Sequence, residues 1–387
     1  MTKEKLLNLV EEQKDHLFQM ACRIFDNPEC KGEERFAAKL LSDELEALGF
    51  AVERGVGNQE TAFRAVWKNG EGGPNIGILG EYDALVGKGH GCGHHLQTPA
   101  AIGAAKALKD VFAGSDVPVT LTVYGTPAEE TYGGKIVMQK AGCFQELDVV
   151  LGTHASRVNG FVGGGSLACN SFVVTFHGRS AHAAGAPWQG RSAMDAMLLM
   201  FQGIEFMREH VRDGTRMHYA IEEAIGPANV VPARAVAKVG LRSKKNEDLE
   251  ELNERFRKIV QGACLMTETT ADMAGSNMYM ARKSNYTLAN VAQENFRQLG
   301  IPVADRLVKE SGGSTDFGNV SCIKPGALLY IPYEDAASHS DEWVAAGKTE
   351  KAERCLMDSA KMLAAMVYDL ILNPETIQKA QEEFDKT

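Results

Sequence analysis

The sequence lacks any hydrophobic run close to the roughly 20 residues that a membrane-spanning helix needs. It also lacks a basic excess: 41 Lys and Arg face 51 Asp and Glu, and a formal net charge of −10 argues against a nucleic-acid surface. Eight cysteines in 387 residues are too few for a disulfide scaffold. Residues 1–17 are typical of a charged amphipathic helix and not of a signal peptide. These absences favour a globular, cytoplasmic enzyme that does not bind membranes or nucleic acids.

The length of the chain exceeds that of one ordinary compact module, so two domains are expected. Hydrophobic residues make up 44% and charged residues 24%, as in globular proteins. Helical spacing in residues 3–24, 33–48 and 96–111 alternates with apolar strands near 51–53, 61–66, 76–79, 117–125 and 147–154. Three of these strands run into polar, glycine-containing loops. They predict an α/β sheet whose carboxyl edge collects those loops, where active sites form in such folds.

The pattern changes near Gly163. A strand and loop (171–184), a Met-rich helix (190–210), a strand (217–223), a strand pair broken at Pro232 (226–243), an amphipathic helix (246–267) and another strand (272–281) follow. Helices and an apolar strand (326–332) then resume. This order predicts a discontinuous first domain, 1–167 and 284–387, with a smaller α+β domain, 168–283, inserted between its halves. The methionines at helical spacing are more simply explained by packing than by function.

Four loops contain residues that bind metals. Cys92 and His94 lie in GHGCGHH, a carboxylate pair lies in GTPAEE, and histidines lie in GTHAS and AASHSDEW. Taken singly, each histidine is more often an ordinary polar residue, and adjacent glutamates usually form a solvated face. Taken together, sulfur, imidazole and carboxylate donors are the ligands that zinc, cobalt and manganese accept. Two ions about 3.5–4 Å apart would share such ligands and activate a water.

The motifs CGH, PAEE, GTH and a late His, in that order around an insert, resemble those of the dinuclear metal amidohydrolases. This family includes aminoacylases, carboxypeptidases, auxin-conjugate hydrolases and p-aminobenzoyl-glutamate hydrolases. GHGCGH together with GSTDFGNVS resembles the branch of p-aminobenzoyl-glutamate hydrolase and a cytosolic dipeptidase. The resemblance implies a three-layer catalytic domain with a mixed, largely parallel sheet and helices on both faces, plus an inserted dimerisation or lid domain.

The resemblance also implies roles for individual residues. Cys92 stands at the bridging metal ligand, as a thiolate, and the other ligands of two divalent ions (zinc, manganese or cobalt) are His94, Glu130, His154 and His339. Glu129 matches the general base, which takes a proton from the attacking water and returns it to the leaving amine. Asp83, in EYDAL, matches an acid that orients metal ligands. No role transfers to His90 or His95.

In the inserted domain, His182 matches a histidine that relatives present across the dimer interface, so a homodimer is expected. Asn229 and Arg242 match residues that bind the free carboxylate of the substrate. For Ser314 and Asp316, direct participation and a purely structural turn both remain open. The expected activity is hydrolysis of an amide that joins an acyl or aminoacyl group to an amino acid. The alternatives are a true dipeptidase and a binding protein that kept the fold without its metals.

Overall fold

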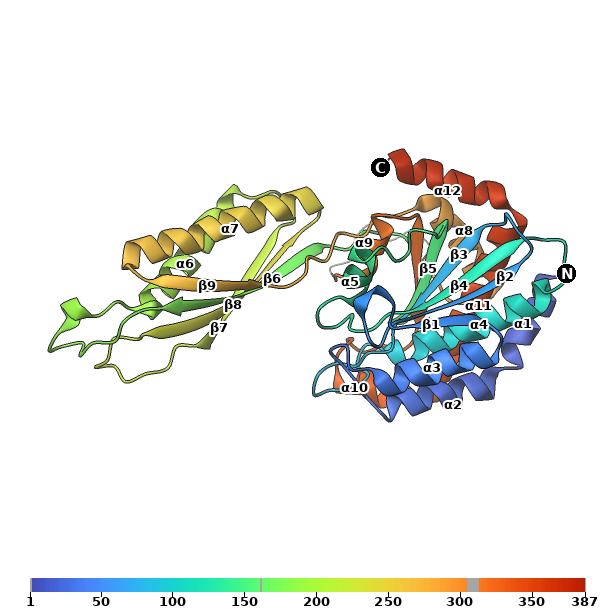
Figure 1. Cartoon of the computed structure of the whole chain (residues 1–387), viewed down its shortest axis with the longest axis horizontal. Helices are drawn as coiled ribbons and strands as arrows, with labels where there is room; N and C mark the ends of the chain where they lie inside the picture. Colours follow the sequence, from blue (N-terminus) through green and yellow to red (C-terminus); the bar gives the residue numbers. More distant parts are fainter. Residues whose placement is uncertain (1, 161, 305–312, 387) are drawn as a thin grey trace. The chain divides into compact units, whose positions relative to one another are not determined.

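The chain leaves its first structural unit for one long segment and returns to it, as the computed structural model shows (Figure 1), and a second, short segment that ends at Ser314 also belongs to the other unit. The structure describes residues 2–160, 162–304 and 313–386. The first unit consists of the chain before Ser166 and most of the chain from Arg282 onward, and the second consists of Ser166–Ala281 together with Ser314.

A mixed six-stranded sheet forms the middle of the first unit, in the order β1-β2-β4-β3-β5-β10. The strands are β1 (Ala51–Arg54), β2 (Phe63–Asn69), β3 (Asn75–Gly80), β4 (Val119–Gly125), β5 (Val149–Ser156) and β10 (Gly326–Pro332). The strands β4, β3, β5 and β10 run parallel, whereas β1 and β2 add two antiparallel pairs at one edge. The prediction of a mixed, largely parallel sheet is confirmed.

Helices cover both faces of this sheet because its central strands are apolar on both sides. Ile78, Leu151 and Leu329 face a large core beneath α4 and α11, while their neighbours Leu79 and Val150 face a smaller core beneath α5 and α9. The helices of the first unit are α1 (Lys3–Glu11), α2 (Lys14–Phe25), α3 (Arg35–Ala47), α4 (Gln97–Phe112), α5 (Gly134–Lys140), α8 (Tyr286–Gln298), α9 (Phe317–Ser321), α10 (Asp341–Ala345), α11 (Glu350–Leu372) and α12 (Pro374–Lys386). The three-layer prediction is therefore confirmed.

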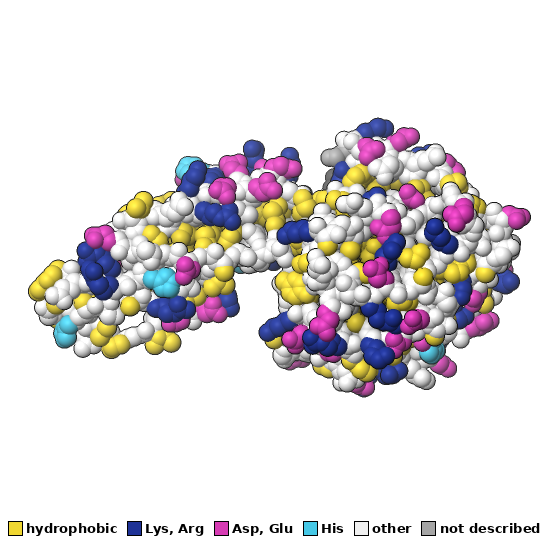
Figure 2. Space-filling view, in the orientation of Figure 1, with side chains coloured by type: hydrophobic (Ala, Val, Ile, Leu, Met, Phe, Trp, Pro, Cys, Tyr) yellow, Lys and Arg dark blue, Asp and Glu magenta, His cyan; other side chains and the backbone are white. Residues whose placement is uncertain are grey.

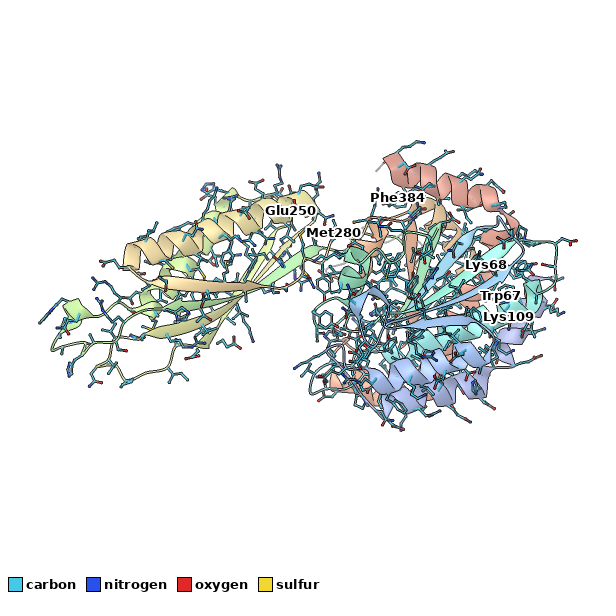
Figure 3. All side chains as sticks on the ribbon, viewed as in Figure 1. Trp67, Lys68, Lys109, Glu250, Met280 and Phe384 are labelled. Carbon is cyan, nitrogen blue, oxygen red and sulfur yellow. The ribbon has the colours of Figure 1, made fainter. Side chains whose placement is uncertain are left out.

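The carboxyl-terminal helix α12 is attached to the rest of the first unit by an aromatic and a backbone contact. Phe384, labelled in Figure 3, has its ring centroid 3.8 Å from Nζ of Lys283. The same ammonium donates a hydrogen bond of 2.6 Å to the carbonyl oxygen of Phe384. A cation over an aromatic face adds electrostatic attraction to the packing.

The second unit is a separate antiparallel sheet with two helices on one face (Figure 1). Its sheet order is β7-β8-β6-β9. The elements are β6 (Ala168–His177), α6 (Ala193–Met207), β7 (Arg216–Glu223), β8 (Arg234–Ser243), α7 (Asn246–Thr267) and β9 (Thr270–Gly275). Met197, Met200 and Met207 of α6 are buried in its core, as expected for packing residues.

Two local predictions were wrong. The helical stretch 3–24 is interrupted between Glu11 and Lys14, where the side-chain amide of Gln13 donates to the carbonyl oxygens of Leu9 and Gly103. The strand pair around Pro232 is a single strand, β8, because the preceding segment makes only an isolated bridge between Val230 and His182. Proline lacks the N–H that a longer ladder would need. Within the described residues, no helix is both long and apolar enough to cross a membrane.

Candidate metal centre

The loops that follow β3 and β4, together with β5 itself, bring the predicted metal-binding residues to one edge of the sheet. Cys92 and His94 lie between β3 and α4, Glu129 and Glu130 follow β4, and His154 lies near the end of β5. Parallel strands end at the same edge, so residues far apart in sequence meet there. This explains why the order of strands and loops in the sequence was enough to anticipate the grouping.

The structure brings all five predicted ligands together. Ligand atoms of Cys92, His94 and His154 lie within 4.8 Å of one another, and so do those of Cys92, Glu130 and His339. Sγ of Cys92 is 3.4 Å from Nε2 of His154, and Nε2 of His339 is 3.4 Å from Oε1 of Glu130. Cys92 belongs to both groups, which is the position that a bridging ligand requires.

The chemistry of these donors fits a pair of divalent cations. Among the described residues, buried Nε2 of His94 and Oε1 of Glu130 form no hydrogen bond. Nε2 of His94 does lie 3.1 Å from Oε2 of Glu81, and Oε1 of Glu130 lies 3.4 Å from Nε2 of His339, but neither pair has hydrogen-bond geometry. Buried polar atoms without a partner are costly, and a cation would satisfy both of these. The mixture of sulfur, nitrogen and oxygen donors suits zinc, manganese or cobalt.

Burial and neighbouring charges shift the pKa values of this cluster. Burial raises the pKa of the Cys92 thiol, so the buried thiolate needs a nearby cation. Burial alone would lower the pKa of His94, but Glu81, Cys92 and Asp83 outweigh it and raise that pKa well above the ordinary value. Burial, followed by the charges of Glu81 and Asp316, raises the pKa of Glu129 well above that of a free carboxyl. The cluster therefore favours added positive charge.

Asp83 joins the two ligand loops. Its Oδ1 is 2.9 Å from Nδ1 of His94, and its Oδ2 accepts a hydrogen bond of 2.9 Å from the backbone N–H of Glu130. The Asp83 carboxylate is fully buried. Because Nδ1 of His94 faces this carboxylate, Nε2 is the nitrogen left for a metal. This is the geometry expected of a residue that orients metal ligands.

Two residues at the site adopt a backbone conformation that non-glycine residues rarely use. Ala128, which precedes Glu129, has φ of 58°, and His339 has φ of 68°. Positive φ costs free energy for a residue with a Cβ and persists where the surroundings enforce it. The strain thus lies at the residue before the predicted base and at the half-exposed His339.

A buried ionic network beside the cluster was missed by the sequence analysis. Nζ of Lys135 lies 2.6 Å from Oε1 of Glu81 and 2.7 Å from Oδ1 of Asp316. Glu81 directly follows the buried strand β3, and Lys135 follows two glycines after the PAEE motif. These two positions were the sequence features that could have indicated the network. Asp316, whose role was left open, therefore contacts Lys135 and belongs to this network.

The two histidines without a predicted role have backbone partners. Nε2 of His95 is 2.9 Å from the carbonyl oxygen of Gly347, and Nε2 of His90 is 3.2 Å from that of Ile24. Their rings lie 5.0 Å apart, and both pack against Phe25. Burial lowers the pKa of His95 to about 4 and that of His90 well below its ordinary value. Both are therefore neutral packing residues.

The three candidates of the inserted segment lie in the second unit. His182 and Asn229 are exposed and adjacent, since the N–H of Ala183 donates to the carbonyl oxygen of Asn229 at 2.9 Å. Arg242 is half-buried on β8, and its Nη1 donates to Oγ of Ser314 at 2.9 Å. That hydroxyl donates in turn to the carbonyl oxygen of Leu167 at 2.7 Å, so Ser314 is held within the second unit.

Comparisons with known proteins identify relatives of this chain. Residues 169–266 match the model of the peptidase dimerisation domain. The chain is 31% identical to one of the subunits of p-aminobenzoyl-glutamate hydrolase of Escherichia coli, over 97% of this chain and 93% of that protein. It is also 31% identical to human Xaa-Arg dipeptidase, over 97% and 90%.

A solved structure supports the fold. A Bacillus subtilis protein described as a dinuclear metal-binding peptidase of the M20 family superposes with a TM-score of 0.67, covering 93% of this chain and 99% of that one. At 19% identity this likeness concerns the fold alone. The identities across nearly the whole chain establish the relationship, and the chain belongs to the M20 family of peptidases and amidohydrolases.

Proposed function

We propose that this hydrolase cleaves the amide bond of N-acyl or aminoacyl amino acids that have a free carboxylate. The observation on which the proposal depends is the position of Glu129, whose carboxylate lies within 4.8 Å of ligand atoms of His94 and Glu130. p-Aminobenzoyl-glutamate, named in one relative, and dipeptides, named in another, are both amides of this type.

Two divalent ions are proposed as cofactors. Cys92 would bridge them, and His94, Glu130, His154 and His339 would complete the ligand set. When bound, such ions supply Lewis acidity that activates a water and stabilises charge on the scissile carbonyl. Zinc, manganese and cobalt all suit these donors, and the thiolate favours zinc.

Glu129 is proposed as the general base. Glu129 as a residue is 9% exposed, and its pKa is raised by burial first and by neighbouring carboxylates second. A raised pKa makes the carboxylate a stronger base, and such a group accepts a proton from the attacking water and donates it to the leaving nitrogen. Asp83 would hold His94 and the loop of Glu129 and Glu130 in position during this proton transfer.

Arg242 and Asn229 are proposed to bind the free carboxylate of the substrate. A guanidinium pairs with a carboxylate through two parallel hydrogen bonds. In the structure, Arg242 uses Nη1 for the neutral hydroxyl of Ser314, which a charged carboxylate would replace favourably. A true dipeptidase, with the same mechanism, is the second candidate and is favoured by the identity to Xaa-Arg dipeptidase.

The inserted segment 168–283 is proposed to form a homodimer and to present His182 to the site of the partner subunit. The match to a peptidase dimerisation domain supports this, as do large hydrophobic side chains exposed on the unit, including Trp188, Phe206 and Leu265. Figure 2 shows hydrophobic side chains reaching the surface of this unit. A cytoplasmic location is also proposed, because all eight cysteines are free.

The test compares two adjacent glutamates. Glu129→Gln should abolish turnover and leave the metal content, measured by elemental analysis, nearly unchanged. Glu130→Gln should lower both activity and metal content, because it removes a proposed ligand. Normal turnover by the Glu129→Gln protein would disprove the mechanism.

The substrate class needs a separate experiment. Hydrolysis of p-aminobenzoyl-glutamate, N-acyl amino acids and dipeptides should be compared with zinc, manganese and cobalt in turn. Preference for dipeptides across all three metals would favour the dipeptidase. Failure to bind any of these metals would support the alternative that the chain is a binding protein without catalytic activity.

A further inference from the structure

Lys135 is a buried cation whose ammonium group is paired with two buried carboxylates. Its side chain is 1% exposed, at the start of the short helix α5. A buried ammonium is tolerated only when carboxylates pair with it closely. Here Oε1 of Glu81 lies at 2.6 Å and Oδ1 of Asp316 at 2.7 Å. The remaining Asp316 oxygen, Oδ2, accepts the backbone N–H of Lys135 at 3.0 Å.

The same contacts determine where Glu81 points. Its Oε1 is taken by Lys135, while its Oε2 accepts a hydrogen bond of 2.7 Å from Nε2 of Gln97. Oε2 also lies 3.1 Å from Nε2 of His94, the nitrogen available to a metal. A Glu81 carboxylate released from Lys135 would be an anionic oxygen donor directly beside a proposed metal ligand.

The carboxylates near Lys135 would form a competing oxygen site without it. Carboxylate oxygens of Glu81, Glu129 and Asp316 lie within 4.8 Å of one another, all of them buried. Three carboxylates at this separation repel one another and attract a divalent cation. The ammonium of Lys135 supplies positive charge at this position, so the protein itself provides what a divalent cation would otherwise provide.

We propose that Lys135 is a positioning residue, a fixed internal counter-ion that withholds Glu81 and Asp316 from the metal ions and leaves Glu129 as the carboxylate that serves the reaction. The proposal rests on the proposed metal-dependent amide hydrolysis. It assigns Asp316 an indirect role, because both of its oxygens are engaged by Lys135. It also explains why a lysine lies six residues after the predicted base.

The decisive variant is Lys135→Met, which keeps the length of the side chain and removes its charge. Contacts one shell beyond metal ligands typically contribute 10–100-fold to activity or metal affinity. We expect kcat to fall by about that factor, with KM within about twofold, because substrate binding does not involve this network. Lys140→Met, at the exposed end of the same helix, is the control and should match the wild type.

The readout that does not depend on activity is the visible and near-ultraviolet spectrum of the cobalt-substituted protein. Released carboxylates that reach the metal would alter the ligand-field bands and the thiolate-to-cobalt charge-transfer band of Cys92. This spectrum should change in Lys135→Met and stay constant in Lys140→Met. If the wild type hydrolyses none of the amide substrates, the proposed function is disproved. The spectra would still test the role of Lys135.

Two further variants distinguish the proposed role of Lys135 from simple misfolding. Asp316→Asn keeps the size of the side chain and leaves Lys135 paired with Glu81, so it should change the cobalt spectrum less and retain a folded circular-dichroism signal. Lys135→Met combined with Asp316→Asn removes one unpaired carboxylate, and its kcat should recover severalfold over Lys135→Met alone. Folded Lys135→Met protein with a wild-type cobalt spectrum and a kcat within twofold of normal would overturn the proposal. So would a double variant that shows no recovery.

Discussion

The two units hold their candidate residues in opposite ways. In the first unit, Cys92, His94 and Glu129 are buried and surrounded by charged neighbours, and they lie in the segments that follow the parallel strands β3 and β4. In the second unit, His182 and Asn229 are exposed and lie on two separate loop segments, which an isolated bridge between His182 and Val230 and the hydrogen bond from Ala183 to Asn229 connect. Buried polar residues must have partners, so their structure already reveals much of their chemistry. Exposed residues can be satisfied by water or by local contacts, as when Nδ1 of His182 accepts a hydrogen bond of 3.0 Å from the N–H of Gly185, so their structure reveals less about what they bind.

The largest expected effect is the loss of a proposed ligand in the first unit. His154→Ala should reduce kcat/KM by at least about 10³-fold and lower the metal content, since Cys92 and His94 would remain as an incomplete set. Activity assays combined with elemental analysis measure both quantities. His177→Ala, which removes a half-exposed histidine of the second unit paired with Asp272, is the control. Equal effects of the two substitutions would contradict the contrast between the units.

The sequence predicted the parts of the site that follow from strand order. The apolar stretches at 76–79, 117–125 and 147–154 correspond to β3, β4 and β5, and their loops met at one sheet edge as expected. Glu81 and Lys135 were missed because their pairing depends on where the tertiary fold places the start of α5 relative to the residue that follows β3. No local pattern encodes that packing. Asp316, distant in sequence, reaches Lys135 only through the tertiary fold, so its role stayed open.

In the second unit, sequence patterns predicted the elements and not the site. The predicted strand and loop at 171–184 and the amphipathic helix at 246–267 correspond to β6 and α7, and both elements are present. His182, Asn229 and Arg242 were singled out only by resemblance, because an exposed polar side chain leaves no signature in hydrophobic periodicity. The roles of these three residues remain predictions.

Burial in the first unit should also affect stability. Glu34 is fully buried, accepts the N–H of Gly32 at 2.9 Å, and has a pKa raised by burial to about 7. A carboxyl whose pKa is raised on folding keeps its proton in the folded state, so its contribution to stability falls as pH rises from about 4.5 to about 7. The loss amounts to roughly 3 kcal/mol for this group.

Denaturant unfolding of Glu34→Gln at pH 5 and pH 8 measures this effect. Relative to the wild type, the variant should gain stability between the two pH values, because glutamine cannot ionise. Glu60→Gln, an exposed glutamate that pairs with Arg35, is the control and should show no such gain. A wild type and a Glu34→Gln variant with parallel pH profiles would show that burial of this carboxyl is not costly.

A smaller effect is expected for substrate binding in the second unit. Arg242→Lys keeps the charge and loses the planar fork, so KM should rise roughly ten- to hundredfold with kcat little changed. Arg234→Lys on the same strand, whose guanidinium pairs with Glu223, should leave KM unaltered. Steady-state kinetics on a substrate with a free carboxylate and on its methyl ester separate the possibilities. Equal loss on both substrates would exclude carboxylate recognition by Arg242.

The exposed His182 can serve its own subunit or the partner, and a mixture of two inactive variants distinguishes these cases. Mixing inactive Glu129→Gln protein with inactive His182→Ala protein should restore activity if the histidine acts across the dimer. Random mixing makes half of the dimers hybrid, each with one complete site of two, so about a quarter of wild-type activity should return. If His182 acts within its own subunit, every site in the mixture lacks one residue and no activity returns. Recovery would mean that the buried residues of one subunit and the exposed histidine of another form a single site, which explains why the inserted unit leaves that histidine exposed.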